Sequence, residues 1–197
     1  VFLDKEKELG LKLSSKLNNY NHKAIFKECD LVNIEDLKLK INQIRQEIGL
    51  ISILINNAAN DDRHDIDSVT PELWDNRMNV NLRHYFFTTQ SVYKDMKKLG
   101  KGTIVNIGSI SWMMGQGGMP GYTTAKSAIV GLTRTTARDL GVYNIRVNCV
   151  VPGWIITDRQ KKLWLTPEIE KQQLEKQCIK KMLEPNDIAK PVLFFAS

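Results

Sequence analysis

Three side chains that can together transfer a proton lie close to one another in this sequence. Tyr122 and Lys126 stand four residues apart in G-Y-T-T-A-K, and Ser109 ends the segment V-N-I-G-S thirteen residues before Tyr122. Residues four apart on a helix share one face, so we expect the Lys126 ammonium near the Tyr122 phenol. A nearby positive charge favours phenolate and lowers a tyrosine pKa from its ordinary value of about 10. The sequence therefore predicts a proton-transfer site in which Ser109 could hydrogen-bond a substrate oxygen.

Alternating strands and helices are predicted to position these residues. Apolar segments bounded by turn residues predict strands at 1–4, 24–29, 51–56, 103–108 and 144–151. Between and after them, apolar residues spaced by three and four predict helices. The first carries Leu9, Leu13 and Leu17 on one stripe, and the second is capped by Asn33 and ended by Gly49. The others are predicted at 70–98, 121–141 and 167–181, with a last helix capped by Asn186. The segment 51–56 is almost entirely apolar, as in strands buried on both faces. This pattern predicts an α/β protein with a doubly wound parallel sheet in a single domain, residues 1–197.

Several suggestive segments follow directly after predicted strands. Asn56-Asn57-Ala58-Ala59 follows one strand, Ser109 follows the next, and Pro152-Gly153 follows the last. Ligands of doubly wound sheets bind beyond the carboxyl ends of the strands. We therefore expect these segments to share one rim, with Tyr122 reaching it from the helix after Ser109.

Composition excludes several classes of protein. The 197 residues are 42% hydrophobic and 25% charged, the mixture of a globular protein with a substantial core. The formal net charge is +6 and the pI about 9.2, but the lysines are scattered along amphipathic helices with few aromatic residues nearby. This predicts a solvated basic surface with no nucleic-acid partner. No apolar run approaches the roughly 20 residues that a membrane span needs, and no secretory signal opens the sequence.

Cysteine and histidine spacing predicts neither disulfides nor a metal site. Cys29, Cys149 and Cys178 are odd in number and far apart. Cys29 and Cys149 fall in predicted strands, so we expect buried thiols there and a reducing cytoplasm. His64 and His84 have no second ligand at a helpful spacing, so we expect surface or hydrogen-bonding histidines.

The ordered motifs resemble one enzyme family. N-N-A-A, N-V-N, V-N-I-G-S, Y-T-T-A-K and P-G-W-I-I-T follow one another with the order and spacing of the short-chain dehydrogenase/reductase family, and the likeness covers the whole chain. The resemblance implies a Rossmann-like fold and a nicotinamide cofactor. It also implies a homo-oligomer, a dimer or tetramer, formed through the helices 70–98 and 121–141.

The resemblance assigns a role to each matching residue. Tyr122 would be the general acid/base, Lys126 would lower its pKa and hold the nicotinamide ribose, and Ser109 would orient the substrate oxygen. Asn81, the second asparagine of N-V-N, would anchor a water that links Lys126 to solvent. The cofactor-binding residues implied are Asp4, Asp30, Leu31, Asn57, Ala58, Tyr122, Lys126, Pro152, Gly153, Ile155 and Thr157.

Asp4 bears on the choice of cofactor. It closes the first strand, where the family places the residue that selects between NAD and NADP. A carboxylate there can accept both ribose hydroxyls of NAD and would repel the extra phosphate of NADP. We therefore expect NAD; the structural alternative is a strand-end aspartate that caps the next helix.

The sequence departs from the family pattern in two ways. Ala59 replaces the glycine that usually follows N-N-A. The sequence also begins at the family's second strand and stops before its last, so the fold is expected to lack the first strand with its Gly-rich loop and the last strand. In this topology the first strand lies mid-sheet, and its absence is expected to leave a slot there.

Further segments resemble bacterial aldose 1-dehydrogenases of the D-xylose and L-arabinose type. These are N-D-D-R-H (60–64), N-L-R-H (81–84), G-S-I-S-W (108–112), T-D-R-Q (157–160), L-T-P-E (165–168) and Q-C-I-K (177–180). The resemblance implies hydride transfer from the C1 hydroxyl of an aldose to NAD, with an aldonolactone as product. The residues expected to contact the sugar are Ser109, Ser111, Trp112, Gln116, Trp154, Arg159 and Gln160.

The sequence also fits two alternatives. One is a short-chain dehydrogenase for another secondary alcohol, such as a 3-hydroxyacyl thioester or a hydroxysteroid. The other is a truncated, non-catalytic binding or oligomerisation remnant.

Overall fold

The computed structural model describes residues 1–19 and 23–197. Its strands are β1 (Phe2–Asp4), β2 (Phe26–Glu28), β3 (Ile53–Asn56), β4 (Gly102–Ile107) and β5 (Ile145–Val150). Its α-helices are α1 (Lys7–Leu17), α2 (Ile34–Glu47), α3 (Pro71–Met78), α4 (His84–Leu99), α5 (Pro120–Leu140), α6 (Asp158–Leu163), α7 (Pro167–Lys176) and α8 (Pro185–Ala196). Three short helices complete the fold: η1 (Ile66–Ser68) and η3 (Gly141–Tyr143) are 3₁₀-helices, and η2 (Asn79–Arg83) is a π-helix.

In the part of the chain that the structure describes, all the strand pairs are parallel, and they form two separate sheets. β1 pairs with β2, and β4 pairs with both β3 and β5. Among the described residues no strand pairing joins β1 to β3. The sheet is therefore divided where the family resemblance implied a slot, and the α/β class with parallel strands is confirmed.

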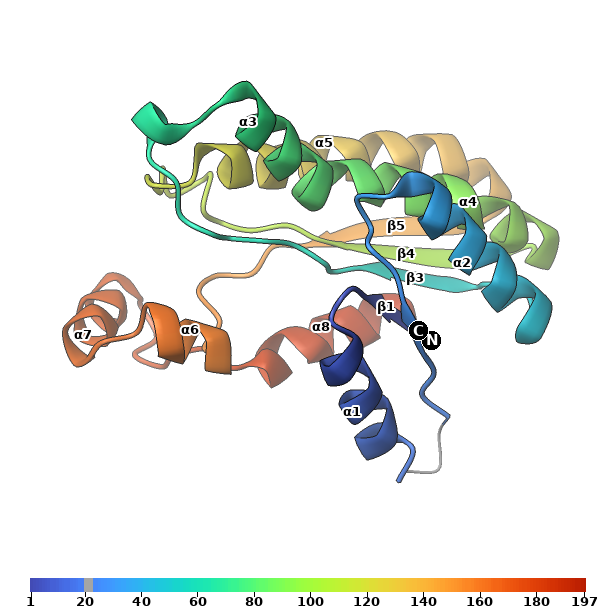
Figure 1. The fold of residues 1–197 in the computed structure, drawn as a ribbon, viewed down its shortest axis with the longest axis horizontal. Coiled ribbons are helices and arrows are strands. Elements are labelled where there is room, and N and C mark those ends of the chain that lie inside the picture. Colours follow the sequence, from blue (N-terminus) through green and yellow to red (C-terminus); the bar gives the residue numbers. More distant parts are fainter. Residues whose placement is uncertain (20–22) are drawn as a thin grey trace.

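Helices cover both faces of the strands. In Figure 1, α2, α3, α4 and α5 lie over one face of β3–β5, and α1 and α8 lie on the other side. The segment with α6 and α7 extends beyond one end of the strands. The main core joins α2, α4 and the strands, through Leu37 and Ile41, Val92 and Met96, and Ile104 and Ile145. A smaller cluster packs α8 against β4 and β5.

Local capping explains where several helices begin. The Asn33 side chain accepts a hydrogen bond from the Asp36 N–H, which confirms the predicted cap of α2. Thr70 caps α3 in the same way, with Pro71 in the first turn. Glu184, not Asn186, caps α8, because Glu184 and Asp187 form a reciprocal capping box.

The predicted helix 70–98 is not one regular helix. It is divided into α3 and α4 by the π-helix η2, which coincides with N-V-N. A π-turn inserts an extra residue into the helical ladder, and apolar spacing does not reveal it. The prediction of 167–181 was also too long, since α7 ends at Lys176, and α6 was missed because it has only six residues.

The strand 51–56 is less buried than predicted. Ile53 and Ile55 are exposed, while Leu54 is half-buried and Asn56 is buried. The reason is that α4 packs against one face of β3, whereas α8 packs on β4 and β5.

Candidate active site

Two of the predicted catalytic side chains, Ser109 and Tyr122, open onto a cleft of about 630 Å³, whereas Asn81 and Lys126 are buried and do not line it. Gly108 and Ser109 line it directly after β4, and Tyr122 reaches it from the first turn of α5. The segment after β5 lines the opposite side, with Pro152, Gly153, Trp154, Ile155 and Thr157. The cleft thus lies at the carboxyl ends of two adjacent parallel strands, as the sequence predicted.

The start of α5 is held in place by a buried histidine. His64 Nε2 accepts a hydrogen bond from the Gly121 N–H at 3.1 Å, and His64 Nδ1 lies 2.9 Å from the Asp62 carbonyl oxygen. A glycine is required at 121, because a Cβ there would lie 2.8 Å from Arg77 Cβ. His64 therefore fixes the helix end that carries Tyr122.

Tyr122 is half-buried beside Ser109. Burial raises the pKa of the Tyr122 phenol, the Ser109 hydroxyl lowers it in part, and Asp61 and Arg63 act in opposite directions. This net increase differs from the expectation that Lys126 would lower the Tyr122 pKa. The Lys126 Nζ lies 5.7 Å from the centre of the Tyr122 ring, but its hydrogen bonds go elsewhere.

Lys126 is almost completely buried one turn after Tyr122. Its Nζ donates to the Ile107 carbonyl oxygen at 2.7 Å and to Tyr85 Oη at 3.1 Å. Burial lowers the pKa of Lys126 to about 8, and Cys149 opposes this decrease.

Asn81 is fully buried in the π-helix, which packs against α5. Its Oδ1 accepts from the Asn60 N–H at 2.8 Å, and its Nδ2 donates to the Arg77 carbonyl oxygen at 3.0 Å. Asn81 therefore links the loop after β3 to the end of α3. π-turns of this kind occur frequently at functional sites.

The residues expected to hold the adenosine half of the cofactor lie at or just after the ends of β1, β2 and β3. Asp4 ends β1 beside Glu28 of β2, and its Oδ1 accepts from the Glu6 N–H. Asp30 and Leu31 follow β2, where Asp30 Oδ1 accepts from the Val32 N–H. Asn57 and Ala58 follow β3. The Asp4 and Asp30 carboxylates are solvent-exposed, so they can accept hydrogen bonds from hydroxyl groups of a dinucleotide.

A polar network borders the cleft, which Asp61, Trp154 and Gln160 line and Arg159, contrary to prediction, does not. Gln160 Nε2 donates to Asp61 Oδ2 at 2.7 Å, and Gln160 Oε1 accepts from Trp154 Nε1 at 2.7 Å. Arg159 pairs with both Asp61 and Asp62, which ties α6 to the loop after β3. The sequence did not indicate Asp61 as a site residue, since its partners are almost a hundred positions away.

Other residues lining the cleft were also missed. They are Arg63, Ile110, Met114, Met119, Trp164, Ile169, Gln172, Gln173 and Lys176. The Arg63 guanidinium lies over the Trp164 ring at 5.1 Å. Most of these residues belong to loops or to α7, where helical spacing carries no sign of a ligand.

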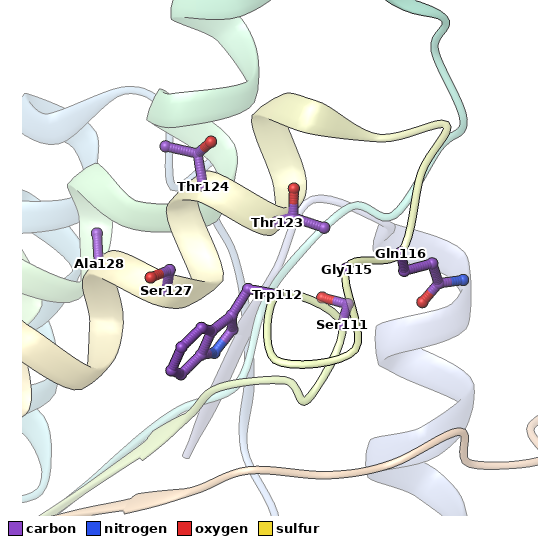
Figure 2. Close-up of a pocket in the computed structure, with 8 residues that line it drawn as sticks. All are labelled: Ser111, Trp112, Gly115, Gln116, Thr123, Thr124, Ser127 and Ala128. Carbon is purple, nitrogen blue, oxygen red and sulfur yellow. The ribbon is translucent and has the colours of Figure 1, made fainter.

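Trp112 does not line this cleft. It lines a neighbouring pocket of about 510 Å³ with Thr123, Thr124, Ser127 and Ala128 of α5. Figure 2 shows its ring beside Ser127, while Gln116 lies on the other side of the loop. Ser111 and Gln116 line both the cleft and this pocket, so the structure places them where the sequence predicted.

His84 lies beneath the site and is not at the surface. It is buried, and its pKa is lowered to about 4 by that burial. Its ring lies near the backbone of Asn79 and Ala58, which opposes that decrease in pKa in part, so a surface position is wrong for His84. His64 makes the expected kind of hydrogen bond, to the Gly121 N–H. In 1–19 and 23–197, no three His, Cys, Asp or Glu side chains gather as metal ligands.

Within the described part of the chain, no helix combines the length and apolar character needed to cross a membrane.

Comparison with known proteins identifies the family. A family model described as short chain dehydrogenase matches residues 1–168. The chain is 47% identical over 197 residues to a D-xylose 1-dehydrogenase of Caulobacter vibrioides, covering 100% of this chain and 77% of that protein. It is 42% identical over 198 residues to a probable galactose dehydrogenase of Rhizobium meliloti, with the same coverage.

Solved structures show the same fold. A 7α-hydroxysteroid dehydrogenase complexed with NADH and 7-oxo glycochenodeoxycholic acid superposes with a TM-score of 0.93 at 30% identity, covering 99% of this chain and 76% of that one. A gluconate 5-dehydrogenase from Burkholderia cenocepacia J2315, in complex with NADP and tartrate, superposes with a TM-score of 0.90 at 24% identity and with the same coverage.

The fold and the matches together define the class of protein. The chain belongs to the short-chain dehydrogenase family, whose members are oxidoreductases that use NAD or NADP.

Proposed function

We propose that this chain is the catalytic and dinucleotide-binding domain of an NAD-dependent aldose 1-dehydrogenase in the cytoplasm. The observation that carries the proposal is the 47% identity, over all 197 residues, to a protein named D-xylose 1-dehydrogenase. The cleft supports it, because Asp61, Gln116, Gln160, Gln172 and Gln173 offer many hydrogen-bonding groups to a hydroxyl-rich substrate. Trp154 and Trp164 line the same space and can stack on a sugar face.

The proposed reaction removes a proton and a hydride from C1 of the sugar. Tyr122, as phenolate, takes the proton of the C1 hydroxyl, and Ser109 donates a hydrogen bond to the carbonyl oxygen that develops. Acid–base groups of this kind typically contribute about 10²–10⁴-fold to the rate. Lys126 supplies the positive charge that favours phenolate, and Asn81 holds the adjoining loop and helix together.

The nicotinamide cofactor, when bound, accepts the hydride. Lys126, Thr157, Ile155 and the Pro152-Gly153 segment would hold its nicotinamide half. Asp4, Asp30, Leu31, Asn57 and Ala58 would hold its adenosine half. The exposed Asp4 carboxylate favours NAD over NADP, because it would repel a 2′-phosphate.

Oligomer formation is part of the proposal. The family resemblance suggests a dimer or tetramer built on α4 and α5. In support, the apolar side chain of Phe86 on α4 is exposed, and the pocket of Figure 2 opens along the side of α5. We expect no nucleic-acid or membrane partner.

A second candidate is a dehydrogenase of another secondary alcohol. The 30% identity to the 7α-hydroxysteroid dehydrogenase favours it. A screen of the full-length protein would separate the two, with pentoses, hexoses, 3-hydroxyacyl thioesters and hydroxysteroids as substrates and NAD and NADP as cofactors. Turnover confined to aldoses, with aldonolactone as product, is expected. Turnover confined to steroids or thioesters would overturn the aldose proposal, and no turnover at all would favour the binding remnant.

A further inference from the structure

Tyr85 meets Lys126 in the interior of the protein. Its phenol donates a hydrogen bond to the Ile107 carbonyl oxygen at 3.0 Å. Lys126 Nζ donates to that same carbonyl at 2.7 Å and to Tyr85 Oη at 3.1 Å. The phenol, the ammonium and the carbonyl thus form a closed triangle of hydrogen bonds.

The backbone around Tyr85 is firmly held. The Tyr85 side chain is fully buried. Its carbonyl oxygen accepts from Thr89 Oγ1 at 2.8 Å, Thr88 Oγ1 at 3.1 Å and Asn56 Nδ2 at 3.4 Å. Asn56 in turn donates to Asn106 Oδ1 of β4. Tyr85 therefore presents its hydroxyl to Lys126 from a fixed position.

The ammonium has no acidic partner nearby. Among the described residues, no carboxylate lies within 4.0 Å of Lys126 Nζ. The titratable groups that face it are Tyr85 and His84 of α4, Tyr122 on α5 and Cys149 of β5. Burial raises the pKa of Tyr85 and Cys149 and lowers that of His84, so these neighbours are uncharged near neutral pH. Hydrogen-bond acceptors, not counter-charges, must keep the ammonium stable there.

The Ile107 carbonyl and the Tyr85 hydroxyl are these acceptors, and within the described part of the chain the third Lys126 N–H has none. An ammonium has three N–H donors, of which Lys126 uses two on Ile107 and Tyr85. The Lys126 Nζ also lies 5.3 Å from the centre of the Tyr85 ring and 5.7 Å from that of Tyr122. A cation placed over aromatic faces gains further electrostatic stabilisation.

We propose that Tyr85 is a positioning residue, whose hydroxyl holds the Lys126 ammonium charged and directed along the face that carries Tyr122. The inference rests on the role of Lys126 in the proposed function. Nothing in the N-V-N or Y-T-T-A-K motifs points to it, since Tyr85 lies 41 residues before Lys126.

The direct test measures the Lys126 charge without requiring catalysis. In protein labelled with ¹³C at the lysine ε-carbon, the Lys126 signal is identified by its loss in Lys126→Met. Its pH titration is then compared in the unmodified protein, in Tyr85→Phe and in Tyr93→Phe. Tyr93→Phe is a matched control, because it removes a phenol hydroxyl from the same helix two turns away.

Tyr85→Phe should lower the Lys126 pKa by about one unit, the effect expected when an ionised donor loses one acceptor. Tyr93→Phe should leave it unchanged. Equal Lys126 titrations in Tyr85→Phe and the unmodified protein would overturn the proposal. Circular dichroism checks that each variant is folded.

The pH profile of turnover gives a second readout that separates this proposal from the substrate assignment. For whichever alcohol is oxidised, the alkaline limb of the kcat profile should move to lower pH by about one unit in Tyr85→Phe. A uniform loss of kcat at every pH would instead mean a purely structural role. A shifted Lys126 titration in a protein that oxidises no sugar would refute the aldose assignment and leave the role of Tyr85 intact.

Discussion

Lys126 carries its charge in a part of the molecule that is closed to water. The pKa of this buried group is about 8, against 10.5 for an ordinary lysine, so its charge and the stability of the fold are linked. Between these two pH values the unfolded chain binds a proton that the folded protein does not. The free energy of unfolding contributed by Lys126 therefore rises with pH across this window and is lowest below it.

Replacing Lys126 by methionine should remove this dependence. Relative to Lys126→Met, the unmodified protein should gain on the order of 3 kcal/mol as pH rises from about 8 to 10.5. The side chains of Tyr85, Tyr122 and Cys149 make the free energy of unfolding fall as pH rises. Both proteins contain these residues, so their effect cancels when the two proteins are compared. Urea unfolding at a series of pH values measures the difference in unfolding free energy between the two proteins. Parallel stability curves for the two proteins would contradict the assigned burial of the charge.

Asp4 should decide the choice of cofactor. Removing its carboxylate in Asp4→Ala should raise the ratio of kcat/KM for NADP to that for NAD by about tenfold or more, because juxtaposed like charges cost several kcal/mol. Glu6→Ala, which removes an exposed carboxylate two residues away, serves as the control. An unchanged ratio in Asp4→Ala would mean that this aspartate only caps the start of α1.

Sequence predicted the residues that stand close together in a motif and missed those that meet only in the fold. Ser109, Tyr122 and Lys126 share one strand–helix unit, so their spacing alone placed them together. Tyr85 belongs to no recognised motif. Asp61 lies in the segment N-D-D-R-H (60–64), but the segment did not reveal its contact with Gln160, which lies far along the chain. The Tyr122 pKa was also misjudged, because helical spacing gives the distance to Lys126 but not the burial that raises the pKa.

At the scale of elements, the loop after β3 determines where α5 begins. His64 belongs to this loop and accepts the Gly121 N–H, while Asn60 of the same loop donates to Asn81 in the π-helix. The N-terminal N–H groups of a helix need such acceptors. The loop, η2 and α5 are thus bound together on the side of the site that carries Tyr122.

His64→Ala should destabilise the protein and lower its turnover rate. A buried N–H without an acceptor costs about 1–3 kcal/mol, so the free energy of unfolding should fall by that amount. The kcat should fall as well, because Tyr122 follows Gly121 directly. His64→Gln, whose side-chain oxygen can accept the same hydrogen bond, should recover part of both. Equal behaviour of the alanine and glutamine variants in thermal unfolding and kinetics would contradict this role.

Most elements were predictable from apolar spacing and caps, and the exceptions have physical reasons. The long amphipathic pattern from 70 to 98 concealed η2, since a π-turn shifts the helical register without interrupting the apolar positions. α6 is too short to show a period, and Thr157, whose side chain caps it, precedes no apolar stripe.

At the scale of the whole molecule, α2 joins the two sheets. It follows β2 and packs against α4, which covers the three-stranded sheet. Arg45 Nε contacts both carboxylate oxygens of Asp95, at 2.8 and 3.0 Å, and Arg45 Nη2 donates to the Ser91 carbonyl oxygen. Asp95 is buried, so this ion pair lies within the junction.

Arg45→Met should weaken that junction strongly. It leaves the Asp95 carboxylate buried without its cation, which typically costs about 3–5 kcal/mol of unfolding free energy. Lys38→Met, on the same helix, breaks only the exposed pair with Glu35 and should cost less than about 1 kcal/mol. Urea unfolding compares the two, and similar small losses would show that the ion pair does not hold the sheets together.

The parallel α/β class could be read from the alternation of strands and helices, whereas the burial of individual strands could not. The apolar run of β3 predicted a strand covered on both faces. In the structure Ile53 and Ile55 are exposed, because coverage depends on where α8 and the neighbouring strands lie.

Tyr122 is proposed to accept the proton in an NAD-dependent aldose dehydrogenase. This role is tested most directly by following NAD reduction by D-xylose with the full-length protein and with Tyr122→Phe, which lacks only one hydroxyl. We expect steady reduction by the unmodified protein and a loss of about 10²–10⁴-fold in kcat for the variant, with the fold unchanged. Absence of reduction with D-xylose and every other aldose, or full activity in Tyr122→Phe, would contradict it.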